Sequence, residues 1–403
     1  MLAVLFLLTG VSTVAAGGSR PFAWQRLATA PSERTEVAAA VWADGDIVVA
    51  GGFDTSSETV ATVELYDPKR DEWTAGPPLP IAVDHVMGAS LGGTVYVFGG
   101  YGSNGAPTDR AFALREGTWE ALPSMPEPRA AAGAAASGGE IYVAGGIGAS
   151  GSLASSTLVF DPSGSGSWTT APGLREPREH LGVTSFDGRV YVLGGRGSGD
   201  LSAGAEVFSP KTGSWRQLPD MPTARGGVAA GATRDGFLVV PGGEGASTDD
   251  GTFPQVEAFD VEHERWVSLP PLPTPRHGLG VVGIGNTLYT LAGGPQAGFA
   301  FSGVVEAINL GELASLRCLG KRPTVVGSPG RDILVGTDSR DLIASLGGPD
   351  RVRGDRGPDL LCGGSGDDRL SGGAGRDRLD GGPGKDDCAE PGDRSRRANC
   401  ESS

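Results

Sequence analysis

The sequence predicts an all-β protein built from two tandem repeats. Between residues 22 and 310, glycine pairs that end short apolar runs recur about every 48 residues, and tryptophans follow them by about twenty residues. Further along, an aspartate recurs every nine residues within glycine-rich turns. Short strands separated by turns at a fixed period are typical of propellers and solenoids. The 403 residues suffice for two or three domains, and these repeats account for nearly all of them.

The chain begins with an apolar stretch that ends at about residue 16. Val14, Ala15 and Ala16 have the small side chains of a signal-peptidase site, so we expect residues 1–16 to be a secretory signal peptide. Neither lysine nor arginine precedes the apolar run, and we therefore expect the natural start to lie further upstream. A membrane anchor is the alternative, but these residues are fewer than the ~20 that span a bilayer, and no later stretch could span one.

The longer repeat contains six glycine pairs. They lie at residues 51–52, 99–100, 145–146, 194–195, 242–243 and 293–294. Five tryptophans follow them: Trp73, Trp119, Trp168, Trp215 and Trp266. Trp24 has the same sequence setting as Trp215 and would supply the outer strand that the last repeat lacks. The two ends of the repeat region would then share one sheet and close a ring without an open edge.

These residues resemble the kelch family. The glycine pair ends the second strand of each repeat, an element such as Tyr66-Asp67-Pro68 follows, and tryptophan opens the fourth strand. The resemblance implies that residues 22–310 form a six-bladed β-propeller. Turn signals such as Asp44-Gly45 and Asp187-Gly188 stand between the expected first and second strands, as four-stranded blades require.

An arginine opens the innermost strand in five of the six repeats, and Val83 breaks the series. The resemblance implies that these side chains face one another around the central channel. Arginine clusters recognise carboxylates, so we expect an anionic ligand such as an acidic peptide or a uronic or sialic acid. Alternatively, each arginine pairs with an acidic neighbour (Glu33, Glu36, Glu127, Glu176 or Glu179) to bind one blade to the next. The five are Arg34, Arg129, Arg178, Arg225 and Arg276.

Three histidines follow the same place in alternate repeats. His85, His180 and His277 belong to the second, fourth and sixth repeats, so we expect them to stand around the axis without converging on one metal site.

The sequence favours a binding protein over an enzyme. The propeller region has no cysteine, which excludes the cysteine-modified tyrosine of galactose-oxidase-like kelch enzymes. No Gly-x-Ser-x-Gly motif occurs in a strand-turn-helix context. Sialic-acid epimerases share the six-bladed kelch form, so an enzyme acting on an anionic sugar in an arginine-lined channel is the alternative.

The nine-residue period carries seven aspartates, each followed two residues later by an apolar residue or a cysteine. This pattern resembles the hemolysin-type (RTX) nonapeptide family, G-G-x-G-x-D-x-U-x, over residues 327–389. The resemblance implies a parallel β-roll with two nonamers per coil, whose aspartates bind Ca²⁺ at two edges. The three complete repeats at 363–386 should bind more tightly than the earlier ones. One edge would hold Asp332, Asp350, Asp368 and Asp386, and the other Asp341, Asp359 and Asp377.

The charges of the C-terminal region are balanced. Residues 315–403 carry 15 basic and 15 acidic residues, a balance compatible with a disordered tail, but the unbroken period argues against disorder. The whole net charge of −15 therefore belongs to the earlier part, which disfavours nucleic acid as a partner.

All four cysteines lie after residue 310, and three pairings are possible. We favour Cys388–Cys400 and, by elimination, Cys318–Cys362, as disulfides of an exported protein.

The sequence thus predicts five segments: a signal peptide (1–16), the propeller (22–310), a linker (311–326), the β-roll (327–389) and a C-terminal clasp (390–403). The expected protein is a secreted, extracellular monomer that binds Ca²⁺ through its tail. Its propeller would bind an extracellular protein or glycan.

Overall fold

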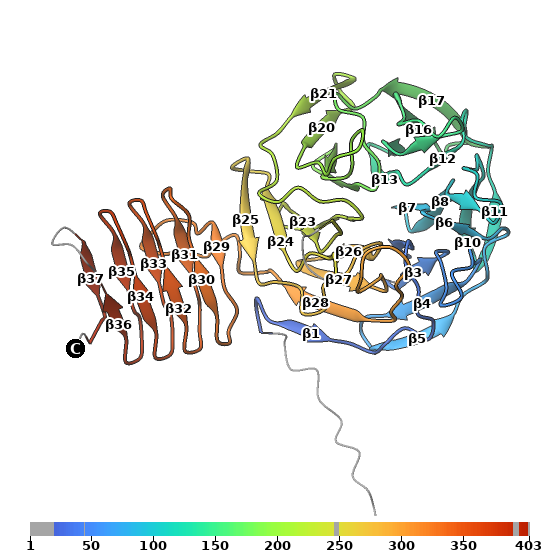
Figure 1. The fold of residues 1–403 in the computed structure, drawn as a ribbon. Helices are drawn as coiled ribbons and strands as arrows, with labels where there is room; N and C mark the ends of the chain where they lie inside the picture. Colours follow the sequence, from blue (N-terminus) through green and yellow to red (C-terminus); the bar gives the residue numbers. More distant parts are fainter. Residues whose placement is uncertain (1–19, 44, 246–249, 390–394, 402–403) are drawn as a thin grey trace, which may run out of the picture.

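A computed structural model describes residues 20–43, 45–245, 250–389 and 395–401. The predicted signal peptide lies outside these residues. The described chain consists of strands and turns, and it contains no helix long and apolar enough to cross a membrane. Figure 1 shows the strands as a ring with a flat stack attached to one side. The all-β prediction, with a propeller followed by a parallel solenoid, is confirmed.

Five blades are separate four-stranded antiparallel sheets. The first four, each written from its innermost strand outward, are β2 (Ala38–Val41), β3 (Ile47–Ala50), β4 (Val63–Asp67) and β5 (Glu72–Ala75); β7 (Met87–Leu91), β8 (Thr94–Phe98), β10 (Ala111–Arg115) and β11 (Thr118–Ala121); β13 (Gly133–Ser137), β14 (Glu140–Ala144), β16 (Ser156–Asp161) and β17 (Ser167–Pro172); and β18 (Gly182–Phe186), β19 (Arg189–Leu193), β20 (Ala205–Ser209) and β21 (Ser214–Gln217).

The last blade contains both ends of the propeller. Its strands are β26 (Gly280–Ile284), β27 (Thr287–Leu291), β28 (Val305–Asn309) and β1 (Trp24–Arg26). Trp24 stands opposite Ile308 in the antiparallel β1–β28 pair, so the N-terminal strand closes the ring as predicted. Two short pairs each lie within one repeat, beside the second and third blades: β6 (Val83–Asp84) with β9 (Tyr101–Gly102), and β12 (Arg129–Ala130) with β15 (Ile147–Gly148).

The predicted count of six blades is wrong, because the propeller has five separate blades. The strands between the fourth and last blades are β22 (Gly231–Ala232), β23 (Phe237–Pro241), β24 (Val256–Asp260) and β25 (Arg265–Leu269). They are the first four strands of a nine-stranded sheet that continues into the solenoid. The join is made by β29 (Val325–Val326), which lies in the predicted linker and pairs in parallel with β25.

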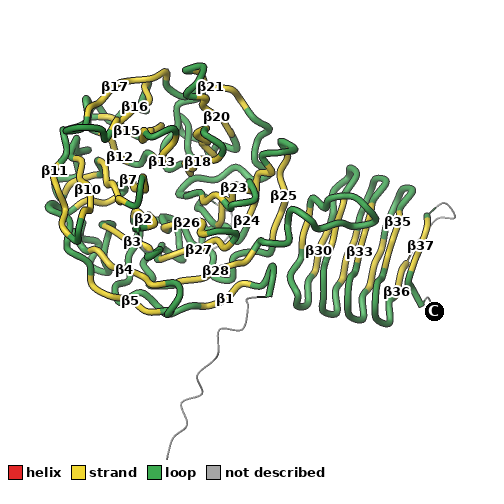
Figure 2. The backbone as a smooth tube through the Cα atoms, turned by 180° about the vertical axis from the view of Figure 1, so that it is seen from behind, coloured by secondary structure: helices red, strands yellow, loops and turns green. Residues whose placement is uncertain are grey.

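The solenoid consists of two parallel sheets, visible as the stack in Figures 1 and 2. The remainder of the nine-stranded sheet is β31 (Leu342–Ala344), β33 (Leu360–Cys362), β35 (Arg378–Asp380) and β37 (Arg396–Ala398), and the second sheet is β30 (Ile333–Val335), β32 (Arg351–Arg353), β34 (Arg369–Ser371) and β36 (Asp387–Ala389). Strands eighteen residues apart pair in register, as Val352 does with Leu370. The apolar eighth residues of the nonamers, such as Leu361, Leu370 and Leu379, form the core between the sheets.

Tryptophans fasten each propeller unit to its neighbour. The indole Nε1–H of each donates a hydrogen bond of 2.8–2.9 Å to a backbone carbonyl of the adjacent unit. Trp24 of the last blade bonds to Pro270, which follows β25. The recurring tryptophan of the sequence is therefore a contact between units, and the contacts run around the whole ring.

The innermost strands are rich in alanine and glycine and pack side by side around the axis. Gly133 shows why: a Cβ there would lie 2.6 Å from the Cβ of Val183 in the next blade. Small residues are required where the strands approach most closely.

Candidate functional site

Two regions of the molecule bring chemically active side chains together: the edges of the solenoid and the central channel of the propeller. The aspartates of the nine-residue period precede the solenoid strands directly, so they lie on two edges as the resemblance implied. Asp332 is half-buried in the first coil, and the other six are buried.

From Asp350 onward, one oxygen of each of these carboxylates accepts a hydrogen bond from the preceding coil. Oδ1 of Asp368 accepts the backbone N–H of Asp350 at 2.8 Å, and Oδ1 of Asp377 accepts that of Asp359 at 2.9 Å. The same bond, across eighteen residues, recurs in each successive coil. The turn conformation thus stacks identical carboxylates above one another.

In the later repeats of the described chain, the second carboxylate oxygen accepts no hydrogen bond. Within the described residues, Oδ2 is buried without a hydrogen-bond partner in five of the aspartates: Asp350, Asp359, Asp368, Asp377 and Asp386. In the two earliest repeats, Oδ2 of Asp332 and of Asp341 accept the backbone N–H groups of Ser328 and Thr337. A buried carboxylate oxygen without a partner is unfavourable, and native proteins pair such atoms or bind a cation with them.

Burial also changes the acidity of this ladder. It raises the pKa of Asp350 to about 7 and that of Asp359 to about 6, and the neighbouring carboxylates of the same edge add to the effect. The pKa of Asp368 is raised for the same first reason. A hard cation held by oxygen ligands would favour the ionised form, so the ladder has the chemistry that Ca²⁺ requires.

Two disulfides hold the ends of this region. Cys318 is bonded to Cys362 and Cys388 to Cys400, the pairing that the sequence favoured. The first ties the segment before the solenoid to β33, and the second ties β36 to the chain end.

The five arginines of the inner-strand position do not line the channel. Their side chains are at most 1% exposed, so the expectation that they face one another around the axis is wrong. Each points into its own unit and meets a glutamate, and most of these glutamates lie on the third strand. The pairs are Arg34–Glu64, Arg129–Glu127, Arg178–Glu206, Arg225–Glu257 and Arg276–Glu306.

The second blade, which lacks the arginine, also lacks the glutamate. Val83 replaces arginine there, and Phe112 occupies the third-strand position that a glutamate holds in four other units. Charge and partner are therefore lost together. The recurring third-strand glutamate is the sequence signal that could have shown these arginines to be structural.

The channel itself is ringed by the residue two places after the arginine position. All six have a left-handed backbone, with φ between 48° and 62°: Glu36, His85, Ala131, His180, Gly227 and Gly278. Backbone hydrogen bonds join successive members, as from the His85 N–H to the Glu36 carbonyl at 3.0 Å. The channel at this level has a volume of about 110 Å³.

The histidines of the channel converge, contrary to the sequence expectation. One ligand atom from each of Glu36, His85 and His180 lies within 4.8 Å of the other two, and the rings of His85 and His180 have centroids 4.7 Å apart. His277 Nε2 is 3.7 Å from Glu36 Oε1 and 3.6 Å from Glu244 Oε2. Side chains from alternate units meet because alanine or glycine occupies the other ring positions and leaves space at the axis.

The cluster is electrostatically coupled. Burial lowers the pKa of His180 to about 3 and also lowers that of His277. Burial opposes protonation of His85 too, but Glu36 and Asp84 outweigh it and raise its pKa. Burial opposes ionisation of Glu36, but the neighbouring histidines and Arg196 together outweigh it and lower its pKa.

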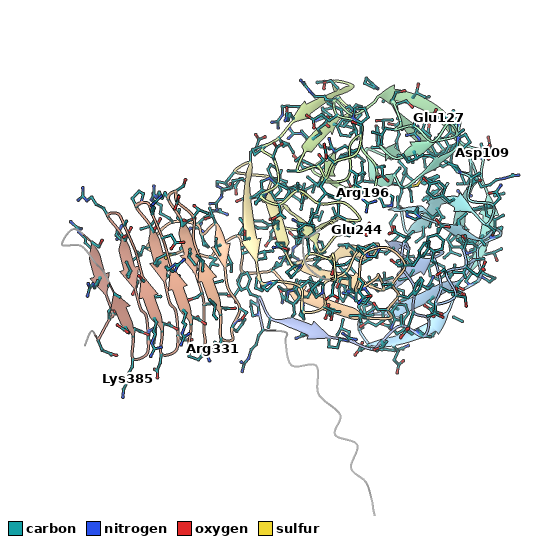
Figure 3. The ribbon with its side chains drawn as sticks, in the orientation of Figure 1. Asp109, Glu127, Arg196, Glu244, Arg331 and Lys385 are labelled. Carbon is teal, nitrogen blue, oxygen red and sulfur yellow. A yellow bond between two sulfur atoms is a disulfide. The ribbon has the colours of Figure 1, made fainter. Side chains whose placement is uncertain are left out.

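Longer side chains surround this cluster. Figure 3 shows Arg196 and Glu244 on the inner side of the ring, where they form an ion pair. Phe53 packs edge-on against both His85 and Phe299, with centroids 5.7 and 5.2 Å apart, and Phe299 is 67% exposed. Sequence reasoning missed these residues, because they lie in loops of generic composition.

Comparison with known proteins agrees with this architecture. The KLHDC2/KLHL20/DRC7 Kelch-repeats domain model matches residues 85–294, and the Kelch motif model matches residues 38–80. The RTX calcium-binding nonapeptide repeat model matches residues 326–361 and 363–388.

Individual relatives match over short segments. The chain is 34% identical to Kelch-like protein terF of Aspergillus terreus over 92 residues, 22% of this chain and 20% of that protein. It is 42% identical to human Kelch-like protein 23 over 67 residues, 16% of this chain and 12% of that one. The matched segments thus span a fifth or less of these relatives.

The solved structure titled "Structure of YjhT" superposes with a TM-score of 0.57 over 70% of this chain and 96% of its own, at 17% identity, which shows a shared fold. The kelch-repeat model matches more than half of the sequence, and this part of the chain forms the ring. The chain therefore belongs to the kelch-repeat family, and it continues into RTX calcium-binding nonapeptide repeats.

Proposed function

We propose that the protein is an extracellular Ca²⁺-binding protein whose kelch propeller binds a protein or glycan partner. The observation that carries the Ca²⁺ assignment is the row of buried Oδ2 atoms without a hydrogen-bond partner in the later repeats. Asp350, Asp359, Asp368, Asp377 and Asp386 would hold the ions, with backbone carbonyls of the turns as further ligands. Asp332 and Asp341 would bind more weakly, because N–H groups already occupy their second oxygens.

Extracellular placement is supported by the same region. Two disulfides persist in oxidising compartments, and Ca²⁺ is abundant outside cells. Folding of the solenoid would then be coupled to the arrival of Ca²⁺.

The test is a Ca²⁺ titration of the full chain after chelation, followed by circular dichroism and calorimetry. We expect β-structure to increase and several ions to bind per chain. Asp368→Asn should remove binding at its coil, because the amide keeps the Oδ1 acceptor but replaces the ionised oxygen. Asp367→Asn is the matched control, since that neighbouring side chain is exposed. Equal binding by both variants, or no response to Ca²⁺, would refute the assignment.

The partner surface is proposed to be the mouth of the channel, where Phe299 is exposed beside Phe53. Wild-type protein would be screened against glycans and extracellular proteins, and binding should be lost in Phe299→Ser. Ile333→Ser is the control, because Ile333 is equally exposed, at 70%, but lies on the solenoid. Binding that survives Phe299→Ser and fails in Ile333→Ser would transfer the partner site to the solenoid. The anionic-sugar enzyme is not proposed, because its arginines are buried.

A further inference from the structure

We propose that Glu36, His85 and His180 form a binding site for a divalent transition-metal ion inside the propeller channel, with His277 beside it. Two imidazoles and one carboxylate offer atoms within 4.8 Å of one another. These groups come from the first, second and fourth blades, so the site exists only when the ring is closed. It is independent of the Ca²⁺ sites proposed for the solenoid.

The hydrogen bonds of the histidines orient the rings for metal binding. Nδ1–H of His85 donates to Asp84 Oδ1 at 2.6 Å, and that of His180 donates to Glu179. Nδ1–H of His277 donates to the Gly294 carbonyl at 3.1 Å. Metal-binding histidines ordinarily hold one ring nitrogen on a carboxylate or carbonyl in this way, which leaves the other nitrogen with its lone pair for the ion.

The free nitrogens of His85 and His277 lie near one carboxylate. Nε2 of His85 is 3.5 Å from Glu36 Oε2, and Nε2 of His277 is 3.7 Å from Glu36 Oε1. Glu36 thus lies between the rings of the two neighbouring repeats. Two neutral imidazoles and an ionised carboxylate are the ligands that Zn²⁺ and its neighbours in the first transition row prefer, whereas Ca²⁺ prefers oxygen alone.

The backbone conformation that places these side chains is unfavourable for residues other than glycine. Glycine adopts the left-handed conformation freely at Gly227 and Gly278, but Glu36, His85 and His180 adopt it at φ of 54°, 48° and 50°. Such strain in non-glycine residues clusters at functional sites. The three large ring residues are also the three whose ligand atoms meet.

The surroundings leave room for a further ligand. Three protein ligands fill three positions of a tetrahedral ion, and the 110 Å³ channel can supply water or a small anion in the fourth. Arg196 lies within the charge field of Glu36 and would attract an anionic group there.

The test uses the full chain in excess Ca²⁺, which keeps the solenoid carboxylates occupied. Co²⁺ is added, visible d–d absorption is recorded, Zn²⁺ is used as the competitor, and bound metal is counted by elemental analysis. We expect one Co²⁺ per chain with nitrogen-ligand absorption, and displacement by Zn²⁺.

Glycine variants separate ligand loss from unfolding. His85→Gly and His180→Gly reproduce the residue found at two other ring positions, so the backbone should keep its conformation. Each should weaken Co²⁺ binding at least a hundredfold and abolish the rise in melting temperature caused by Zn²⁺. The matched control is His263→Ala, since His263 is the remaining histidine of the sequence and lies outside the channel.

Two results would overturn the proposal. One is the absence of stoichiometric Co²⁺ absorption in the wild-type protein, which would leave the cluster as a hydrogen-bonded network. The other is absorption that persists in the His85→Gly, His180→Gly double variant and disappears in His263→Ala, which would place the ion at Asp260, Glu262 and His263.

Discussion

At the residue scale, the buried arginines show how a repeated charge serves the fold. Arg225 is fully buried, donates to Glu257 at 2.7 Å and also donates to the Val240 carbonyl at 2.9 Å. Its guanidinium therefore links the segment that precedes the inner strand β22 to the second and third strands, β23 and β24. The second blade dispenses with the pair by using Val83 and Phe112, which shows that an apolar pair can fill the same position.

A substitution series at this pair would separate structure from ligand binding. Arg225→Met should destabilise the protein by about 3–5 kcal/mol, because Glu257 is left buried and unpaired. The double variant Arg225→Met, Glu257→Leu should recover most of that loss. Urea unfolding measures both values. If Arg225→Met leaves the stability unchanged but abolishes partner binding, the arginine binds a ligand and does not stabilise the fold.

At the scale of elements, the solenoid strands β32 and β33 each follow an aspartate whose protonation affects stability. Burial raises the pKa of Asp350 to about 7 and that of Asp359 to about 6, above the ordinary value near 3.9. The Ca²⁺-free folded solenoid therefore binds protons more tightly than the unfolded chain. This contribution to stability is complete below about pH 4 and is lost as the pH rises through 6 to 7.

The chelated protein should consequently have a more stable solenoid at pH 5 than at pH 8. In excess Ca²⁺ the order should reverse, because the ion binds only the ionised carboxylates. Thermal melts followed by far-ultraviolet circular dichroism, with and without EDTA at both pH values, check this crossing. Asp350→Asn should reduce the pH dependence in EDTA; an undiminished dependence in that variant would assign it to other groups.

At the scale of the whole molecule, the propeller and the solenoid share a sheet and a core. Ser268 of β25 stands beside Val325 of β29, and the Ser268 N–H donates to the Thr324 carbonyl at 2.9 Å. Val326 packs in one buried cluster with Leu269 and Leu313. Figure 2 shows the stack extending directly from the outer strand β25. Stabilising the solenoid should therefore stabilise the propeller.

Tryptophan fluorescence can measure this coupling, because all seven tryptophans of the sequence lie before residue 310. We expect Ca²⁺ to raise the melting temperature seen by fluorescence in the wild-type protein, as ligand linkage requires. Val326→Asp should remove that rise while circular dichroism still reports Ca²⁺-dependent β-structure. If Ca²⁺ does not change the melting temperature seen by fluorescence in the wild-type protein, the propeller and the solenoid unfold independently.

The sequence alone determined the parts of the molecule whose requirements are local. A left-handed turn favours glycine, and a stacked coil needs the same carboxylate every nine residues, so the glycine pairs and the aspartate period predicted propeller and solenoid. The recurring tryptophan marked the outer strands, and Trp24 predicted ring closure, because each unit uses the same contact to its neighbour.

The remaining features follow from contacts between distant parts of the chain. The direction of Arg178 depends on Glu206 across its own sheet, and the meeting of His85 with His180 depends on the width of a channel left open by small residues elsewhere in the ring. The pairing of β25 with β29 turned a predicted blade and linker into one continuous sheet. These outcomes rest on distances between residues far apart in the chain, which a repeat pattern does not specify.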